Sequence, residues 1–317
     1  MRALLIVNPH ATSTTRLRRD VIARALASTV ELEIVETRYR GHGTSLAADA
    51  ASAGYGLVIT LGGDGTVNEA VNGLLRPPRA PAVIPAVPAL AALPGGSANV
   101  FARALGLPPD PVDATGQVLS ALAAGRFRSI GLGLADDRYF TFNSGMGLDA
   151  EVVRAVEGRR AHGRSVSPAL YMRMAGRQFW RLTDRHTPAM HLDSPAPEDP
   201  EGPDDPLFWC TVSNTAPWTY VGRRPVQTNP EASFDAGLDV FGLRSLSTAR
   251  TLSTLRQMLS ARQAGPPRGR GIVTAHNLSV LTVTADRPVA FQIDGEYVGE
   301  RERVSFRSVP DALRVVM

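Results

Sequence analysis

The chain has 317 residues, of which 44% are hydrophobic and 20% are charged, and its net charge is +4. This composition is typical of a globular protein with room for two domains, and it argues against a disordered chain and against a nucleic-acid-binding protein. All 34 basic residues are arginine, which excludes the P-loop and protein-kinase mechanisms and any lysine Schiff base. The single Cys210 excludes a disulfide framework and a cysteine-rich metal site, and it fits a reducing cytosol.

No segment of the sequence is typical of a signal peptide or a membrane span. The N-terminal apolar run ends at Asn8, which is too early for a signal peptide. The longest apolar tract, 80–94, is interrupted by prolines and is too short to cross a bilayer. We therefore expect a cytoplasmic protein that can still associate with a membrane surface.

Residues 1–125 alternate between strand and helix patterns. Strands are expected at 3–8, 31–36, 55–61 and 89–94. Helices are expected at 15–28, from an N-cap at Thr44 to Gly54, after the glycines at 62–65 as far as Leu75, and from an N-cap at Ser97 to Gly106. This alternation predicts a parallel α/β sheet with helices on both faces.

From residue 126 onward the pattern changes to short strands joined by hairpin turns, such as the turn at Asp136-Asp137. Strands are expected at 208–214, 237–243, 272–276, 279–284, 289–293 and 303–307. The pattern predicts a second, mostly antiparallel domain. The acidic, proline-rich segment 193–206 is expected to be a solvated loop.

Two glycine-rich turns each connect a strand to a helix, "GGDGT" at 62–66 and "GGS" at 95–97. In an open parallel sheet, ligands bind beyond the carboxyl ends of the strands, where the N–H groups at helix N-termini attract phosphate. Asp64 is a negative charge inside such a turn. A purely structural interpretation is also open: Thr66 and Glu69 fit a capping box, and Asp64 is a common turn residue.

The run "GGDGTVNEAVNGL" (62–74) closely resembles the nucleotide-binding motif of the diacylglycerol kinase catalytic-domain family, which includes sphingosine kinases and soluble bacterial lipid kinases. Other family landmarks follow in the expected order, at "IVNPHAT" (6–12), "LPGGSANVFARALGLP" (93–108), "FNSGMGLDAEVV" (142–153) and "FQIDGEYVG" (291–299). The resemblance covers essentially the whole chain.

The resemblance implies a phosphofructokinase-like α/β nucleotide domain at 1–125 and an antiparallel β-sandwich domain for the lipid substrate at 126–307. Residues 308–317 are expected to return to the first domain, and ATP with Mg²⁺ is expected in the cleft between the domains. The implied activity is transfer of the ATP γ-phosphate to a lipid hydroxyl, above all that of diacylglycerol, giving phosphatidic acid. A kinase of a sphingoid or polyprenol-like alcohol and a catalytically weak ATP-binding regulatory protein are the alternatives.

The same resemblance assigns roles to individual residues. The residues implied to bind the nucleotide are Asn8, Thr37, Gly62, Gly63, Asp64, Gly65, Thr66, Ser97 and Asn99. The glycines let the backbone approach phosphate oxygens, and Ser97 supplies a hydroxyl where the family has threonine. Asp64 is also expected to help hold Mg²⁺, directly or through water.

Asp294 in "IDGE" is the candidate general base, which would accept the proton of the lipid hydroxyl. Glu296 is expected to orient the site or to assist with the metal. Spacing alone favours another role for Asp294, because Asp-Gly is the commonest dipeptide of a type I′ hairpin turn. The family resemblance favours catalysis.

Two positions depart from the family pattern. Val100 replaces an aspartate of the second nucleotide motif, and Ala236 replaces the second aspartate of the loop 231–242, which holds a structural Mg²⁺ in some bacterial members. Asp235 and Asp239 are the candidates to replace the lost ligand, and Asp235 is the tentative metal ligand.

Basic and aromatic residues suggest where a lipid surface could bind. Arg173, Arg177, Arg181 and Arg185 recur every four residues and would form a basic stripe on a helix, with a solvated helix face as the alternative. The loop 214–225, with Trp218, Tyr220 and the two arginines Arg223 and Arg224, is a second candidate for a membrane-facing or substrate-lining segment. We expect a lipid substrate at the membrane surface, peripheral membrane association and no nucleic-acid partner, and we leave a homodimer open.

Overall fold

The computed structural model describes residues 1–11, 15–75, 87–160, 174, 176, 187–193, 206–260 and 265–317. The chain divides into two compact units. Unit 1 comprises Met1–Gly131 together with Asp311–Met317, and unit 2 comprises Leu132–Pro310. The division falls after Gly131, whereas the sequence analysis places the domain boundary after residue 125.

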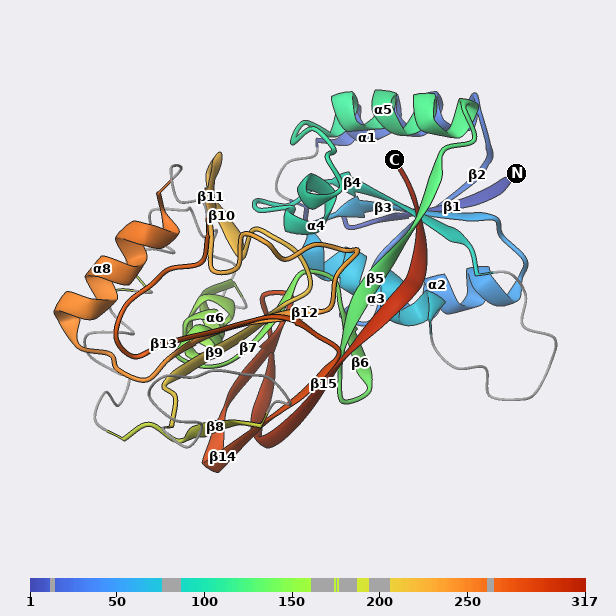
Figure 1. Ribbon diagram of the computed structural model, residues 1–317. Helices are drawn as coiled ribbons and strands as arrows, with labels where there is room; N and C mark the ends of the chain where they lie inside the picture. Colours follow the sequence, from blue (N-terminus) through green and yellow to red (C-terminus); the bar gives the residue numbers. More distant parts are fainter. Residues whose placement is uncertain are drawn as a thin grey trace. The chain divides into compact units, whose positions relative to one another are not determined.

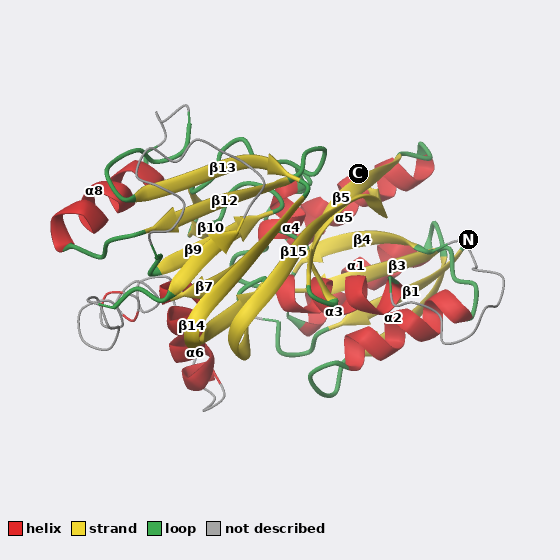
Figure 2. Cartoon of the chain, turned by 60° about the horizontal axis from the view of Figure 1, so that its bottom comes forward, coloured by secondary structure: helices red, strands yellow, loops and turns green. Residues whose placement is uncertain are grey.

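Unit 1 contains a parallel sheet (Figures 1 and 2). Its strands are β1 (Arg2–Val7), β2 (Glu31–Glu36), β3 (Leu57–Gly62), β4 (Ala89–Pro94) and the last residues of β15 (Glu296–Val316). They are hydrogen-bonded in the order β2-β1-β3-β4-β15, and each neighbouring pair is parallel. Every residue of the central strands β3 and β4 is buried, as expected for strands covered on both faces.

Helices cover both faces of this sheet. They are α1 (Arg16–Ala27), α2 (His42–Ser52), α3 (Asp64–Leu74), α4 (Val100–Ala104) and α5 (Pro111–Ala123). Helices α1 and α5 lie on one face and α2 and α3 on the other (Figures 1 and 2). A Cβ atom on Gly73 of α3 would lie 2.2 Å from the carbonyl oxygen of Thr44, so these two helices approach closely because Gly73 has no side chain.

The predicted starts of two helices are wrong. Helix α2 begins at His42 after Gly41, which has a φ of 87°, and not at an N-cap Thr44. Helix α4 begins at Val100 after Asn99, and Ser97 is not its N-cap. In both cases the helix start depends on contacts with other residues, described below, that local capping rules do not include.

Unit 2 is built mainly of antiparallel strands. Its strands are β5 (Phe127–Ala135), which begins in unit 1, β6 (Arg138–Phe140), β7 (Asn143–Gly147), β8 (Met190–Asp193), β9 (Trp209–Ser213), β12 (Leu238–Leu243), β13 (Ile272–Leu278), β14 (Val280–Ile293) and the first part of β15. The main order is β13-β12-β9-β7-β14-β15, and β10 (Thr219–Val221) and β11 (Arg224–Val226) form a separate hairpin. The predicted fold class, an α/β domain followed by an antiparallel β domain, is confirmed. The segments 279–284 and 289–293, expected as two strands, form the single strand β14.

Two helices of unit 2 are described, α6 (Leu148–Arg160) and α8 (Thr248–Met258). Within the described ranges, no helix is long and apolar enough to cross a bilayer. The predicted basic stripe from Arg173 to Arg185 and residues 194–205 of the acidic loop lie outside the described residues.

Candidate functional site

The carboxyl edge of the parallel sheet collects several predicted nucleotide-binding residues. Asn8 follows β1, Thr37 follows β2, Gly63 follows β3 and Gly95 follows β4. Because parallel strands end on the same side of a sheet, these residues lie along one edge.

The two glycine-rich turns touch each other through their backbones. The N–H of Gly95 donates to the carbonyl oxygen of Gly62 at 2.7 Å. A Cβ atom on Gly96 would lie 2.7 Å from the Cα of Gly63, and one on Gly95 would lie 2.9 Å from the nitrogen of Gly62. The absence of side chains therefore allows the two turns to come together.

The glycines of the first turn have different surroundings. A Cβ on Gly62 would meet Oγ1 of Thr66 at 2.4 Å, so Gly62 is required for packing. A Cβ on Gly65 would have no atom within 4 Å. Gly65 lies in the first turn of α3, where the helix dipole is positive and the first N–H groups have no acceptor four residues earlier in the helix. The next N–H, that of Thr66, donates to the carbonyl oxygen of Gly63 at 3.0 Å. The open space beside Gly65 is thus suited to an anion such as phosphate.

Asp64 lies in the first turn of α3, and its Oδ1 accepts a hydrogen bond from the N–H of Phe101 at 3.1 Å. The carboxylate therefore also satisfies a donor at the start of α4. Within the described part of the chain, no group of three or more His, Cys, Asp or Glu side chains is placed to hold a metal ion. Mg²⁺ in nucleotide sites is usually held by one or two carboxylates together with phosphate oxygens and water, so a single carboxylate beside an open phosphate position fits such an ion.

Asn99 shapes the second glycine turn. Its side chain accepts from the N–H of Gly96 and donates to the carbonyl oxygen of Gly96, both at 2.8 Å. Asn99 itself is buried and has a φ of 48°, a conformation that asparagine tolerates. Ser97 is exposed at the same turn.

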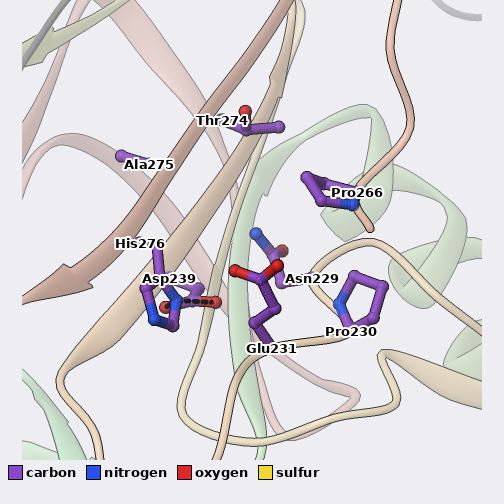
Figure 3. A pocket seen from close by; sticks show the side chains of 8 residues that line it. All are labelled: Asn229, Pro230, Glu231, Asp239, Pro266, Thr274, Ala275 and His276. Atoms are coloured by element: carbon purple, nitrogen blue, oxygen red, sulfur yellow. Dashed lines mark hydrogen bonds and ion pairs between the residues drawn. The ribbon is translucent and has the colours of Figure 1, made fainter. Parts of the chain in front are cut away.

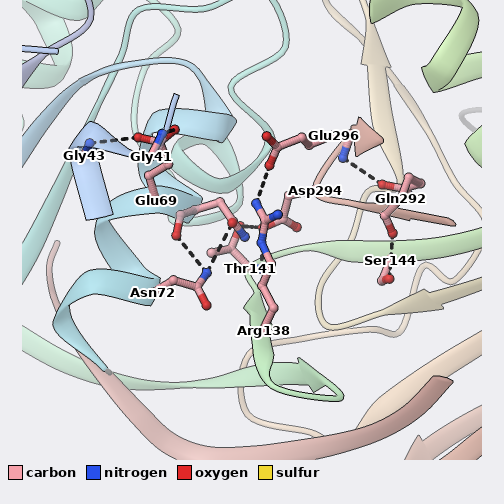
Figure 4. A network of polar contacts seen from close by, with 12 residues as sticks. Gly41, Gly43, Glu69, Asn72, Arg138, Thr141, Ser144, Gln292, Asp294 and Glu296 are labelled. Carbon is pink, nitrogen blue, oxygen red and sulfur yellow. Dashed lines mark hydrogen bonds and ion pairs between the residues drawn. The ribbon is translucent and has the colours of Figure 1, made fainter. Parts of the chain in front are cut away.

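The predicted capping box of Thr66 and Glu69 is wrong. Helix α3 begins at Asp64, and the N-cap Gly63 makes no side-chain capping bond. Glu69 instead accepts the N–H groups of Gly41 at 2.7 Å and Gly43 at 2.9 Å, at the start of α2 (Figure 4). This glutamate stabilises the N-terminus of a neighbouring helix, which is why α2 begins earlier than its sequence predicts.

Asp294 forms a tight turn, and its carboxylate is also buried. Asp294 and Gly295 have φ values of 48° and 73° and connect β14 to β15, as expected for a type I′ turn. The carboxylate accepts hydrogen bonds from the N–H and Oγ1 of Thr141 at 2.8 Å each (Figure 4). It accepts two more from the N–H groups of Phe142 at 3.0 Å and Asn143 at 3.2 Å, which makes four in all. Four donors match the lone-pair positions of a carboxylate and stabilise its charge.

Glu296 follows this turn and forms an ion pair with Arg138 (Figure 4). The two side chains are 17% and 29% exposed, respectively. The pair connects the start of β15 to β6, which gives Glu296 a fixed orientation.

A buried polar network supports the Asp294-Gly295 turn. Nε2 of Gln292 donates to Oδ1 of Asn143 at 2.9 Å and to Oδ2 of Asp149 at 2.7 Å, and its Oε1 accepts the N–H of Gly295 at 2.8 Å. Burial raises the pKa of Asp149 to about 6, and the hydrogen bond from Gln292 partly offsets this rise. The sequence analysis assigned no role to Asp149, although it lies in the family-like run 142–153.

The loop expected to hold a structural ion has a different arrangement. Asp235 is exposed, whereas Asp239 is buried and bonded to Nδ1 of His276 at 2.8 Å and to the N–H of Asn277 at 3.0 Å. Burial raises the pKa of Asp239, and His276 partly offsets the rise. Asp239 lines a pocket of about 100 Å³ with Asn229, Pro230, Glu231, Pro266, Thr274, Ala275 and His276 (Figure 3). A structural ion held by Asp235 stays a prediction.

Comparison with known proteins concerns the part of the chain that contains the two glycine turns. Residues 2–134 match the family model of the diacylglycerol kinase catalytic domain. This segment belongs to the diacylglycerol kinase catalytic-domain family. The match includes both glycine turns, so the resemblance predicted from the sequence is confirmed for this part of the chain.

Two curated relatives align with about half of the chain. The diacylglycerol kinase of Bacillus subtilis is 34% identical over 163 residues, 50% of each chain. The "Probable lipid kinase YegS-like" of Chromohalobacter salexigens is 34% identical over 151 residues, which are 48% of this chain and 45% of the relative. The aligned part thus spans about half the length of these relatives.

A crystal structure of a diacylglycerol kinase from Bacillus anthracis superposes with a TM-score of 0.69. The superposition covers 99% of this chain and 96% of the other, at 20% sequence identity. At this identity the likeness is evidence for the fold.

Proposed function

We propose that the protein is an ATP-dependent lipid kinase that transfers the γ-phosphate to a lipid hydroxyl, most readily that of diacylglycerol. The observation that carries this proposal is the contact between two glycine turns at the carboxyl edge of the parallel sheet, with open space beside Gly65 at the N-terminus of α3. This arrangement suits the phosphates of a nucleotide, and it lies within the segment that matches the kinase family.

Charge neutralisation at the proposed phosphate site cannot involve lysine, because the chain has none. Backbone N–H groups at the start of α3 and arginine side chains are the available positive groups of the protein. Bound Mg²⁺ would supply the remaining neutralisation of the phosphate oxygens, and Asp64 is the residue we propose to hold it.

Asp294 is the proposed general base. Its role requires that one of its four donors give way to the lipid hydroxyl. The Thr141 hydroxyl is the only side-chain donor among the four, and it can rotate without moving the backbone. We propose that the lipid hydroxyl takes this place on Oδ2 and passes its proton to Asp294 as phosphate transfer proceeds. The three backbone donors would continue to orient the carboxylate.

The test uses the purified chain with labelled ATP, Mg²⁺ and detergent micelles that contain diacylglycerol, a sphingoid base or a polyprenol, followed by identification of the phosphorylated lipid. We expect labelled phosphatidic acid. Asp294→Asn should retain ATP binding and lose transfer by about 10²–10⁴-fold. Asp137→Asn, which changes an exposed aspartate of the same unit, is the matched control.

Three results would contradict parts of this proposal. Full activity of Asp294→Asn, with native circular dichroism, would eliminate Asp294 as the base. ATP binding without phosphorylation of any lipid would favour the regulatory ATP-binding alternative. Phosphorylation of only a sphingoid or polyprenol-like alcohol would change the substrate and keep the mechanism.

A further inference from the structure

Two stretches of the sequence of unit 2 contain no acidic residue, although Glu231 and Asp239, which lie between them in sequence, line the pocket beside Pro266. Residues 206–230 and 240–285 contain eight arginines and neither aspartate nor glutamate. Because the net charge of the whole chain is +4, the remaining residues carry a net negative charge. The net positive charge of the chain therefore comes from these two stretches, although most of its arginines lie elsewhere, balanced by acidic residues.

The structure brings parts of both stretches together. The N–H of Gln227, directly after β11, donates to the carbonyl oxygen of Met258 at the end of α8, at 2.8 Å. The side chain of Gln257 on α8 binds the backbone of Arg268 twice, at 2.9 and 3.0 Å. Trp218, Val221 and Met258 belong to one hydrophobic cluster. The β10–β11 hairpin, α8 and the loop 265–271 are thus held against one another.

Six exposed arginines project from these three segments. We call them the basic face; its members are Arg223, Arg224, Arg250, Arg256, Arg268 and Arg270. Helix α8 adds an exposed apolar side chain, since Leu252 is 56% exposed. Leu252 and Arg256 are four residues apart and lie on the same side of the helix. Cationic side chains interspersed with exposed apolar ones are typical of surfaces that bind anionic lipid bilayers.

We propose that the basic face docks on the surface of an anionic phospholipid bilayer and so brings the protein to its lipid substrate. This inference rests on the proposed lipid kinase function, because a protein acting on a water-soluble alcohol would have no need of the bilayer. Charge complementarity identifies the partner: arginines close to an anionic membrane are attracted within about a Debye length, and attraction adds with each residue. None of its six arginines belongs to the residues of the predicted stripe at Arg173–Arg185 or of the proposed phosphate site.

The test measures co-sedimentation of the full chain with sucrose-loaded vesicles, in the absence of ATP. Vesicles of phosphatidylcholine alone are compared with vesicles that also contain phosphatidylglycerol, at low and high salt. We expect binding to the anionic vesicles only, with loss at high salt. The triple variant Arg224→Gln, Arg256→Gln and Arg268→Gln removes one charge from each segment and should weaken partitioning about hundredfold.

A charge-matched control separates this face from general electrostatics. The variant Arg24→Gln, Arg303→Gln and Arg307→Gln removes three exposed arginines outside the basic face, and it should bind anionic vesicles as the wild type does. The proposal would be overturned if the first triple variant bound anionic vesicles as the wild type does, or if both triple variants lost binding equally. It would also be overturned if the wild type bound neutral and anionic vesicles equally, or bound no vesicles. Tighter binding of the wild type to a nucleic-acid duplex than to the vesicles would overturn it as well, if the first triple variant abolished that binding.

The kinase assay in detergent micelles keeps the two proposals distinguishable. The triple variant should phosphorylate lipid in neutral micelles at the wild-type rate, because none of its positions belongs to the proposed nucleotide site or to the Asp294 turn. Vesicle binding without kinase activity would support the docking proposal and refute the proposed lipid kinase function. Kinase activity without vesicle binding would refute the docking proposal alone.

Discussion

Replacing Asp149 with asparagine should stabilise unit 2 at neutral and alkaline pH by an amount that depends on pH. Asp149 is fully enclosed, and burial raises its pKa from 3.8 to about 6. The folded state therefore favours the protonated carboxyl group. A rise of about two pKa units corresponds to about 3 kcal/mol of free energy of unfolding. This contribution is present in full below pH 3.8, and it is lost as the pH rises through about 6.

Asparagine does not titrate, and its Oδ1 can still accept the hydrogen bond from Gln292. The free energy of unfolding of Asp149→Asn, minus that of the wild type, should therefore increase with pH. Integration between pH 4.5 and pH 8 gives an increase of about 2 kcal/mol, because part of the effect has already occurred at pH 4.5.

Urea unfolding followed by tryptophan fluorescence measures this difference. Trp209 and Trp218 lie in unit 2 and report on that unit, and the third tryptophan of the chain, Trp180, lies outside the described residues. Asp137→Asn is the control, since an exposed carboxylate is in water in both the folded and the unfolded chain. A difference for Asp149→Asn that stays constant with pH, or that decreases as pH rises, would refute the assigned direction of the pKa shift.

Four further substitutions test unit 1. Glu69→Gln should weaken the two bonds to the start of α2 by about 1–2 kcal/mol in total, and faster hydrogen exchange of the two glycine amides would show it; unchanged exchange would contradict the capping role. Gly65→Ala should fold normally yet weaken ATP binding, because a Cβ there meets no other atom of the protein. Gly96→Ala should lower the melting temperature, because its Cβ would lie 2.7 Å from the facing turn. Equal melting temperatures of the two variants would contradict this distinction. Gly73→Ala should destabilise by about 1–3 kcal/mol or more through the 2.2 Å clash with α2, and a wild-type melting temperature would show that the helices do not approach as closely as described.

The parts of the fold that depend on local patterns were predictable from sequence. The strand 31–36 is predicted with the bounds of β2, and Gly54 and Gly106 follow the ends of α2 and α4 with positive φ. The turn at Asp136-Asp137 joins β5 to β6 as expected. Each of these features is determined by a few neighbouring residues, because hydrophobic period, strand length and the need for positive φ are local properties.

Features that depend on distant partners could not be predicted in the same way. The sequence contains a capping motif with Glu69, but the carboxylate of Glu69 accepts hydrogen bonds from two glycine amides more than 25 residues away. The bond between Gln292 and Asp149 joins positions 143 residues apart, and nothing in either segment indicates the other. For Asp294, the sequence analysis treated a hairpin-turn residue and a candidate general base as alternatives. The two roles are compatible, because a turn residue can direct its carboxylate into the protein.

The path of β15 affects the folding of this chain during biosynthesis and the choice of fragments for study. Residues 311–317 supply the strand that pairs with β4, through Val315 and Leu90, to complete the sheet of unit 1. During synthesis, the first unit therefore stays one strand short until the ribosome has passed the whole of the second. A recombinant fragment that stops at residue 131 would expose the edge of β4, which is buried in every residue, and would be prone to aggregation. Adding residues 311–317 through a short linker should restore a closed edge, so domain-level studies of nucleotide binding need a fragment that is discontinuous in sequence.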